Sequence, residues 1–284
     1  MPATLKLFDL TPRFLTFYDL ARGETDPDRR WALWQEHYRF AAIPPTEEGL
    51  RQARRMLDES FHRYPEALER IQAGAAGFQP DPRPLLDAVS AQLGFTDDLQ
   101  VVLGLFVGNF ENNPFAYTHE GVPYVWYPVE VGDPVSASIF LPHEFTHALH
   151  QQLSGCQHAY GVATGYLVLM EGLAMRLSAV VTPGHQETAY VSHNDPGWVP
   201  QCREREQAIL SGIRPYLTTA DPDVQFRFTM GSGSTGLIRE AYWTGWRVVG
   251  HLLAQGRTLA DLARVPEADV PALVEQAVGE LLGS

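Results

Sequence analysis

The sequence predicts an α+β protein that is mainly helical and contains one small mixed or antiparallel sheet. Apolar residues at helical spacing run through the first hundred residues and again through the second half of the chain. Two short segments near the middle are rich in Val, Leu and aromatic residues and have the length of strands. The 284 residues are 45% hydrophobic and 19% charged, which is typical of a globular chain rather than a disordered one.

The first hundred residues predict several helices. The clearest, residues 29–40, carries Trp31, Trp34 and Tyr38 at helical spacing. Others are expected from Thr46 to about residue 61, at residues 64–72 and at residues 84–93. We interpret the aromatic stripe as core rather than as a cofactor site, because large aromatic side chains on one helix face usually pack inside the protein. The Gly- and Pro-rich stretch 74–84 is the best candidate for a linker.

The middle of the chain predicts strands rather than helices. Residues 99–108 form the short apolar run LQVVLGLFVG, which is typical of a buried strand. Residues 122–131 predict a second strand, in which Pro123 and Pro128 indicate an edge position. The stretch between them is expected to be a loop or an irregular edge strand. Further helices are expected at 136–153, 166–181, 203–213, 237–253 and 270–282, and a Pro- and Gly-rich loop at 182–201.

Composition and charge limit the partners of the protein. The net charge of −13 leaves no basic surface for nucleic acid or anionic lipid. No apolar run reaches the ~18–20 residues of a membrane span, and the first residues lack the basic region and apolar core of a signal peptide. The two cysteines do not make a disulfide framework. We therefore expect a cytoplasmic protein with reduced thiols, no nucleic-acid partner and no membrane association.

The strongest functional signal is the segment LPHEFTHALHQQL at 141–153. His143 and His147 are four residues apart, which places both imidazoles on one helix face, about 40° apart after one turn. Glu144 is rotated by about 100° from His143, so it is badly placed to bind the same ion but can reach a water beside it. The spacing matches the H-E-x-x-H motif of two zinc ligands and a general base. In a random sequence of this composition, only about 0.02 matches to the motif are expected. The alternative to a zinc site is an ordinary helix that carries two histidines.

A catalytic zinc ion needs a third protein ligand and one open position. Glu171, in the apolar segment LVLMEGLAMRLSAV, is the strongest candidate, because a carboxylate buried alone is costly. The alternatives are His158, His185 or His193 as the ligand, and a structural ion pair between Glu171 and Arg176. Pro142 directly precedes the motif and predicts that the helix begins or kinks there.

The motif at His143, Glu144 and His147, followed by MEGLA at 170–174, resembles the gluzincin branch of zinc peptidases. In that branch the third ligand is a glutamate on a later helix. The chain is most similar to the small predicted zinc-dependent proteases of unknown function in that branch, whose GY-x-x-GY-like segment is matched by AYWTGW at 241–246. The resemblance implies a zincin-like catalytic core and one Zn²⁺ per chain, held by the two histidines and Glu171.

Residues 108–253 are also similar to aminopeptidase-N-type enzymes. The segment GNFEN at 108–112, the zinc motif, MEGLA and YWTG at 242–245 follow one another in the order of that family's motifs. This likeness implies that Tyr242 donates a hydrogen bond to the oxyanion. It also implies that Glu111 holds the free amino group of a peptide.

These signals predict a zinc-dependent peptidase in which Glu144 is the general base and the substrate is a peptide or protein. Residues 1–95 are expected to form a helical region packed on the core, 96–182 the sheet and zinc-binding helices, and 183–284 a loop and a helical C-terminal lobe. In that loop His193 is a candidate for substrate contact. The sequence leaves aminopeptidase and endopeptidase activity open, and the oligomeric state as well. The alternative is a non-catalytic metal-binding regulatory or peptide-binding module on the same scaffold.

Overall fold

The computed structural model describes residues 3–43, 46–111, 113–156, 161–191 and 195–283. Contacts within the chain divide it into two compact units. The sheet unit comprises Thr4–Pro82 and Gln100–Ala137, and the helical unit comprises Met1–Ala3, Arg83–Leu99 and Ser138–Ser284. The three consecutive regions expected from the sequence, 1–95, 96–182 and 183–284, stay a prediction.

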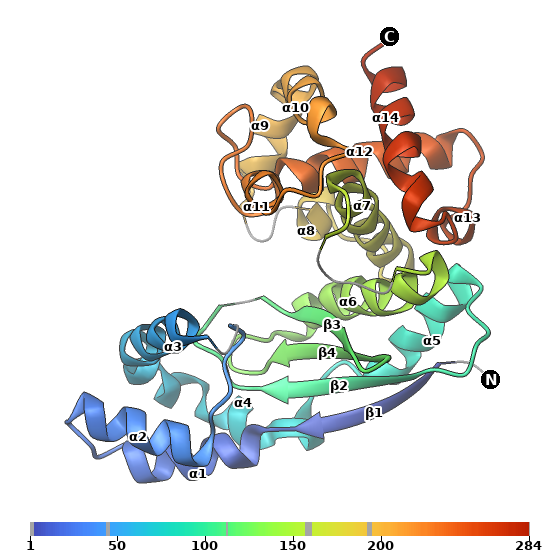
Figure 1. The fold of residues 1–284 in the computed structure, drawn as a ribbon. Coiled ribbons are helices and arrows are strands. Elements are labelled where there is room, and N and C mark those ends of the chain that lie inside the picture. The colour runs from blue at the N-terminus through green and yellow to red at the C-terminus, as the bar shows by residue number, and fades with distance from the viewer. Residues whose placement is uncertain (1–2, 44–45, 112, 157–160, 192–194, 284) are drawn as a thin grey trace. The chain divides into compact units, whose positions relative to one another are not determined.

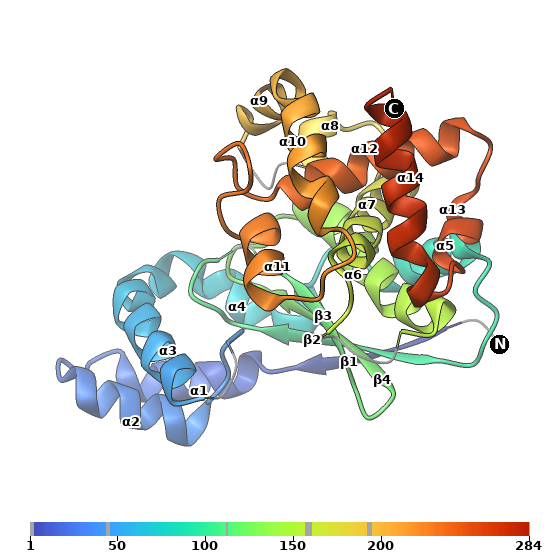
Figure 2. The same ribbon diagram turned by 45° about the horizontal axis from the view of Figure 1, so that its top comes forward.

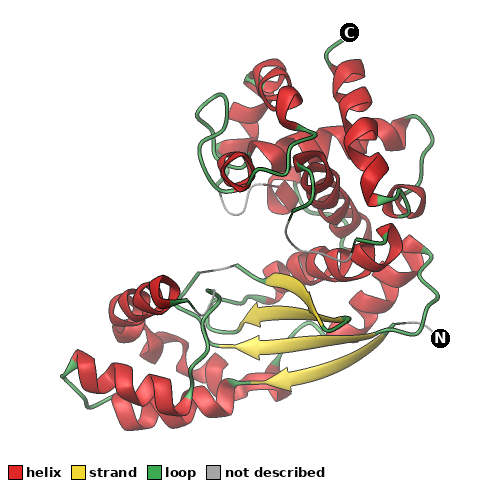
Figure 3. Ribbon diagram, in the orientation of Figure 1, coloured by secondary structure: helices red, strands yellow, loops and turns green. Residues whose placement is uncertain are grey.

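The sheet unit contains one small mixed sheet, so the α+β class is confirmed (Figure 1; Figure 3). Its strands are β1 (Thr4–Asp9), β2 (Gln100–Phe106), β3 (Phe115–His119) and β4 (Val122–Pro128), in the spatial order β1-β2-β4-β3. β2 pairs in parallel with β1 and with β4, whereas β3 pairs antiparallel with β4. The β3–β4 hairpin turns at Glu120 and Gly121, whose φ angles of 49° and 76° suit a two-residue hairpin loop.

Two expectations about the strands are wrong. β4 lies between β2 and β3 and is not an edge strand. Pro123 is tolerated because it precedes the first residue paired with β2, and Pro128 because it follows the last residue paired with β3. β1 lies in a region expected to be helical, and most of its residues are exposed, so it lacks the apolar run of a buried strand. The alternative of an edge strand between the two predicted strands is confirmed by β3.

The helices of the sheet unit are α1 (Thr11–Ala21), α2 (Pro27–His37), α3 (Glu47–Ser60) and α4 (Tyr64–Gly77). Thr46 caps α3, as predicted, and its hydroxyl oxygen accepts a hydrogen bond from the Gly49 amide at 3.0 Å. Trp34 and Tyr38 are buried, which confirms their interpretation as core. The ring centroid of Tyr38 lies 5.3 Å from that of Phe14.

The other helices belong wholly or mostly to the helical unit. They are α5 (Pro82–Leu93), α6 (Pro134–Ser154), α7 (Thr164–Val181), α8 (Glu187–Val191), α9 (Trp198–Glu204), α10 (Glu206–Ile213), α11 (Pro222–Thr229), α12 (Glu240–Ala254), α13 (Leu259–Ala263) and α14 (Val270–Leu281). The expected long helices correspond to α6, α7, α12 and α14. The expected loop at 182–201 is wrong in part, because it contains α8 and the start of α9. These helices have five and seven residues, too few to show a helical period.

α7 forms the core of the helical unit. α12 and α14 pack against it, and the ribbon views show these helices side by side (Figure 1; Figure 2). Within the described part of the chain, α7 is the one helix long and apolar enough to cross a membrane, but 67% of that stretch is buried inside the structure. Packing in the core therefore accounts for its apolar composition.

Candidate metal centre

α6 carries the two motif histidines on one face. The ring centroids of His143 and His147 are 4.6 Å apart. His143, Glu144 and His147 each offer a ligand atom, and these atoms lie within 4.8 Å of one another. His143 and Glu144 are buried and His147 is partly exposed. This largely buried group could hold a metal ion.

Glu171 of α7 adds a carboxylate to this group. Its Oε2 atom lies 3.2 Å from Nε2 of His143 and 3.6 Å from Nε2 of His147. Ligands bound tetrahedrally to zinc at ~2.0–2.2 Å are separated by roughly 3.3–3.6 Å, the edge of the tetrahedron. The distances from Glu171 Oε2 to the two histidine nitrogens therefore agree with the separation of two ligand atoms in a tetrahedral zinc site.

The chemistry of the donors also fits a divalent metal. Two imidazole nitrogens and one carboxylate oxygen are ligands that zinc prefers, and three protein ligands leave one position open. Oε2 of Glu171 is buried without a hydrogen-bond partner among the described residues, and a cation would satisfy it. The alternative ion pair between Glu171 and Arg176 is wrong. Arg176 instead donates from Nε and Nη2 to the carbonyl oxygen of Trp246, at 3.1 and 2.7 Å.

Two glycines allow α7 to approach α12. A Cβ on Gly172, the residue after Glu171, would overlap the carbonyl oxygen of Gly245. A Cβ on Gly245 would overlap the carbonyl oxygen of Val168. The backbones of α7 and α12 are therefore in contact where residues 170–174 cross residues 242–245. This contact fixes the helix that carries Glu171 against the helix that carries Tyr242.

Pro142 lies inside α6, which begins at Pro134, so the expected helix start at this proline is wrong. Proline has no N–H and cannot donate to the carbonyl oxygen of Ser138, four residues earlier. Thr182, at the C-cap of α7, donates from its hydroxyl to this oxygen at 2.7 Å. The hydrogen bond replaces the one that Pro142 cannot make, and it ties the two helices that carry the candidate ligands.

Glu144 lies next to the first histidine and is buried. Burial raises the pKa of its carboxyl group to about 7; the positive charges of His147 and Arg239 oppose this shift, and Glu171 adds to it. A carboxyl group that titrates near neutral pH can both accept and return a proton. Its place beside the two candidate histidine ligands is that expected of a general base.

Tyr242 lies in the first turn of α12 and is 9% exposed. Burial raises the pKa of its hydroxyl, and the Glu171 carboxylate adds to this shift, so the group stays protonated and can donate. The guanidinium of Arg239 covers its ring, with Cζ 3.9 Å from the centroid. Sequence reasoning missed Arg239, because an arginine before a helix is common; its distinguishing backbone conformation is seen only in the structure.

Within the described helical unit, no other residue predicted as a ligand or substrate contact is seen beside His143, His147 and Glu171. His185 is exposed, and its ring lies 6.0 Å from that of Tyr190. His158 and His193 lie outside the described residues. Glu111 is exposed and belongs to the sheet unit, on the connection between β2 and β3. The roles suggested for His193 and Glu111 stay predictions.

The loop that carries Glu111 is held by a buried acid. Oε1 of Glu130 accepts a hydrogen bond from the Phe110 amide at 3.1 Å, and the Tyr64 hydroxyl donates to the carbonyl oxygen of Gly108 at 2.8 Å. Glu130 is fully buried. Burial raises the pKa of its carboxyl group to about 7, although backbone hydrogen bonds oppose the shift.

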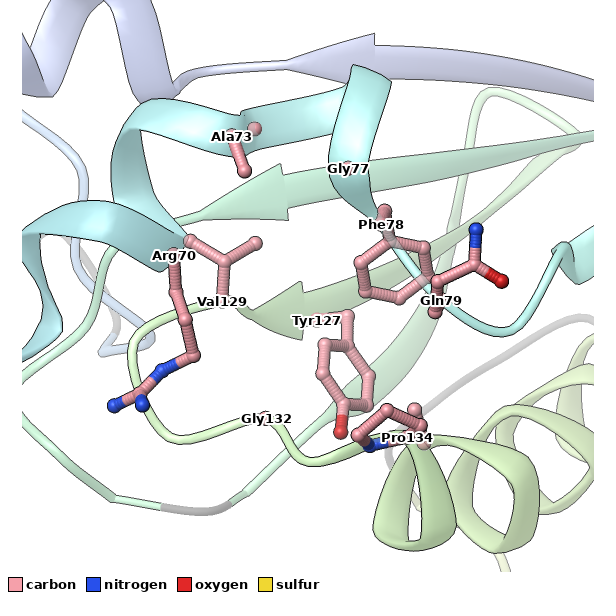
Figure 4. Close-up of a pocket in the computed structure, with 11 residues that line it drawn as sticks. Arg70, Ala73, Gly77, Phe78, Gln79, Tyr127, Val129, Gly132 and Pro134 are labelled. Atoms are coloured by element: carbon pink, nitrogen blue, oxygen red, sulfur yellow. The ribbon is translucent and has the colours of Figure 1, made fainter.

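The sheet unit also contains a separate cavity of about 280 Å³. Figure 4 shows Phe78 and Tyr127 beside each other in its wall, with Arg70 and Gln79 on either side. The Tyr127 hydroxyl is buried and has no hydrogen-bond partner among the residues that the structure describes. The residues predicted to bind metal or substrate do not line this cavity, so it is distinct from the candidate metal centre.

Comparisons with protein-family models, curated proteins and solved structures found no match to this chain.

Proposed function

We propose that this protein is a zinc-dependent peptidase of the gluzincin type, built on a zincin-like core. The observation that carries the proposal is the approach of Glu171 Oε2 to Nε2 of His143 and of His147, at 3.2 and 3.6 Å. These three residues would hold one Zn²⁺ per chain and leave a position open for water or substrate. Structural zinc sites normally have four protein ligands, so three ligands beside an additional glutamate favour a hydrolytic role.

The residues around this position have the chemistry of amide hydrolysis. When bound, zinc polarises the scissile carbonyl as a Lewis acid and lowers the pKa of a water molecule. Glu144 accepts a proton from the attacking water and returns it to the leaving amine. The Tyr242 hydroxyl donates a hydrogen bond to the carbonyl oxygen as negative charge develops there, which typically contributes ~10²–10³ in rate.

Hydrolysis of a randomised peptide library by the zinc-loaded protein tests this proposal. A chelator should abolish cleavage and added zinc should restore it. Glu144→Gln should lower the rate by ~10²–10⁴ while the protein keeps about one equivalent of zinc. Glu204→Gln, at an exposed glutamate of α9, is the matched control and should keep full activity. Undiminished cleavage by the Glu144 variant would contradict the proposal, and zinc binding without cleavage of any peptide would favour the non-catalytic metal-binding module.

The position of the cleaved bond is a separate question within the same proposal. The resemblance to aminopeptidase-N-type enzymes predicts that Glu111 holds the substrate's amino group. N-terminal acetylation of the peptides should then prevent cleavage, and Glu111→Gln should slow cleavage of the free-amine peptides. Unchanged cleavage of acetylated peptides would identify an endopeptidase.

A further inference from the structure

Arg239, directly before α12, has a backbone conformation that arginine rarely adopts. Its φ and ψ angles are 62° and 34°, in the left-handed region. This region is unfavourable for residues other than glycine, asparagine and aspartate, and a residue stays in it only where the surrounding structure holds it. Such strain is concentrated at sites where a side chain has a specific task.

The preceding loop holds Arg239 in place through its neighbour Glu240. Glu240 is fully buried, and its carboxylate accepts four hydrogen bonds of 2.7 Å, from the amide and the hydroxyl of both Ser234 and Thr235. Gly233 is required beside them, because a Cβ there would overlap this carboxylate. The loop is thereby closed onto the start of α12, and the backbone around Arg239 is fixed.

The guanidinium of Arg239 stacks on the Tyr242 ring and hydrogen-bonds the side chain of that residue, but it is not paired with a carboxylate among the described residues. Its Nε is buried without a hydrogen-bond partner, and no carboxylate forms an ion pair with it, within the described ranges of the chain. Arg176 gives a direct contrast. It also stacks, with Cζ 3.4 Å from the ring centroid of Trp246, but its donors are used by the carbonyl oxygen of that residue. Unlike Arg176, whose donors are bound to a backbone carbonyl, Arg239 thus carries a positive charge with no anionic partner among the described residues.

Arg239 directly precedes α12, the helix that contacts α7 at Gly172, next to the candidate ligand Glu171. The ring that its guanidinium covers belongs to Tyr242, the candidate oxyanion donor. A substrate anion bound to Arg239 would thus lie beside the residues that act on the amide.

We propose that Arg239 binds a carboxylate of the substrate next to the amide that is hydrolysed, so that the enzyme selects peptides with a carboxylate at this position. This inference rests on the proposed peptidase function. The Tyr242 ring covers one face of the guanidinium, and an arginine without an anionic partner is well suited to bind a carboxylate through charge-assisted hydrogen bonds. A free C-terminus and the side chain of aspartate or glutamate both present this group.

Peptide binding by the zinc-loaded 284-residue chain tests the inference. The probes are three randomised mixtures of N-acetylated tetrapeptides: one with a free C-terminus and no acidic side chain, one amidated with a single Asp or Glu, and one amidated without either. The protein carries Glu144→Gln so that probes are not cleaved, and retained peptides are quantified by mass spectrometry. We expect roughly 10- to 100-fold stronger retention of a carboxylate mixture than of the neutral one. The better-retained carboxylate mixture identifies the source of the carboxylate.

Two substitutions at position 239 separate binding from folding. Arg239→Gly removes the guanidinium and suits the left-handed backbone, so the variant should fold normally. It should retain the carboxylate mixtures and the neutral mixture equally, to within about twofold. Arg239→Lys keeps the charge but not the paired donors, and should retain part of the preference. Arg227→Met is the matched control. It removes an arginine whose Cζ lies 5.1 Å from the ring centroid of Phe228, and it should leave the preference unchanged.

Equal retention of all three mixtures, or an unchanged preference in Arg239→Gly, would overturn the inference. Hydrolysis by the wild-type protein is measured in parallel. A carboxylate preference without hydrolysis would contradict the proposed peptidase but support the carboxylate site. Hydrolysis without the preference would support the peptidase and contradict the carboxylate site.

Discussion

Gly172 in α7 and Gly245 in α12 are in direct backbone contact, and a Cβ on Gly172 would overlap the carbonyl oxygen of Gly245. Gly172 directly follows the candidate ligand Glu171, and Gly245 lies one helical turn after Tyr242. The contact gives a physical reason for a glycine in each of these segments. It also makes the position of Glu171 dependent on the packing of α12.

Gly172→Ala should therefore disturb both stability and metal binding. The added methyl group has no room, and overpacking of this kind costs ~1–3 kcal/mol of unfolding free energy. The displacement of α7 should move Glu171 away from the two histidines and weaken zinc binding. Denaturant unfolding and competition with a chromophoric chelator measure the two effects.

Gly197→Ala is the matched control for this substitution. A Cβ at this position meets only side-chain atoms of Asp195 and Gln201, at 3.3 and 3.6 Å. Its effect on stability should stay within ~0.5 kcal/mol. An unchanged zinc affinity in Gly172→Ala would show that the helix crossing does not position Glu171.

Thr182→Val should destabilise the protein by a mechanism that depends on Pro142. The substitution removes the hydroxyl that donates to the carbonyl oxygen of Ser138, at a cost of about 0.5–1.5 kcal/mol. In a Pro142→Ala protein the amide of residue 142 can donate to that oxygen instead. The same threonine substitution should then cost much less.

A double-mutant cycle on urea unfolding of the four proteins measures this coupling. We expect Thr182→Val to lower the unfolding free energy much less in the Pro142→Ala protein than in wild type, so the two effects should not add. Strictly additive effects would mean that Thr182 does not replace the hydrogen bond that Pro142 cannot make.

Glu130 should make the protein less stable as the pH rises. Its pKa of about 7 in the folded state lies above the value of 4.5 expected in the unfolded chain, so the folded state binds the proton more tightly. The stability contributed by this group is complete below pH 4.5 and is lost as the pH rises through about 7. The loss amounts to about 3 kcal/mol.

Glu130→Gln cannot titrate and should remove this dependence. The difference in unfolding free energy between wild type and variant, measured from pH 4.5 to pH 8, should follow the titration of one buried group. Glu120→Gln, at an exposed position of the β3–β4 turn, is the control and should leave the pH profile unchanged. Parallel profiles for wild type and Glu130→Gln would contradict the expectation.

Glu171→Ala should weaken zinc binding more than about 100-fold, because the loss of an outer-shell partner alone costs 10- to 100-fold. Isothermal titration with zinc measures the affinity, and circular dichroism checks the fold. Glu204→Ala, at an exposed position, should bind zinc as wild type does. An unaltered affinity in Glu171→Ala would assign the third ligand to another residue.

The candidate metal-binding group could be predicted from the sequence because its geometry is mostly local. A helix alone brings His143 and His147 to one face, and Glu171 stands out as an acid in an apolar helix. The crossing of Gly172 with Gly245 depends on tertiary packing that no local pattern encodes. Arg239 was missed for a similar reason, since its importance follows from one left-handed backbone conformation and a closed loop.

The long helices were predictable from periodicity, whereas the order of the strands was not. α6, α7, α12 and α14 each bury a continuous apolar face, which the spacing of their residues shows. Strand order depends on contacts between segments distant in the chain, so the two prolines of β4 gave a wrong edge position. β1 is mostly exposed and α8 has five residues, and neither is long or apolar enough to show a clear period.

The proposed function depends on His143, His147 and Glu171 binding one divalent cation. Anomalous diffraction at the zinc absorption edge, on crystals of the zinc-loaded protein, tests it most directly. We expect one strong peak within ~2.0–2.2 Å of Nε2 of both histidines and of a carboxylate oxygen of Glu171. A fully loaded crystal with no peak at the two histidines, or with a peak there that Glu171 does not reach, would contradict it.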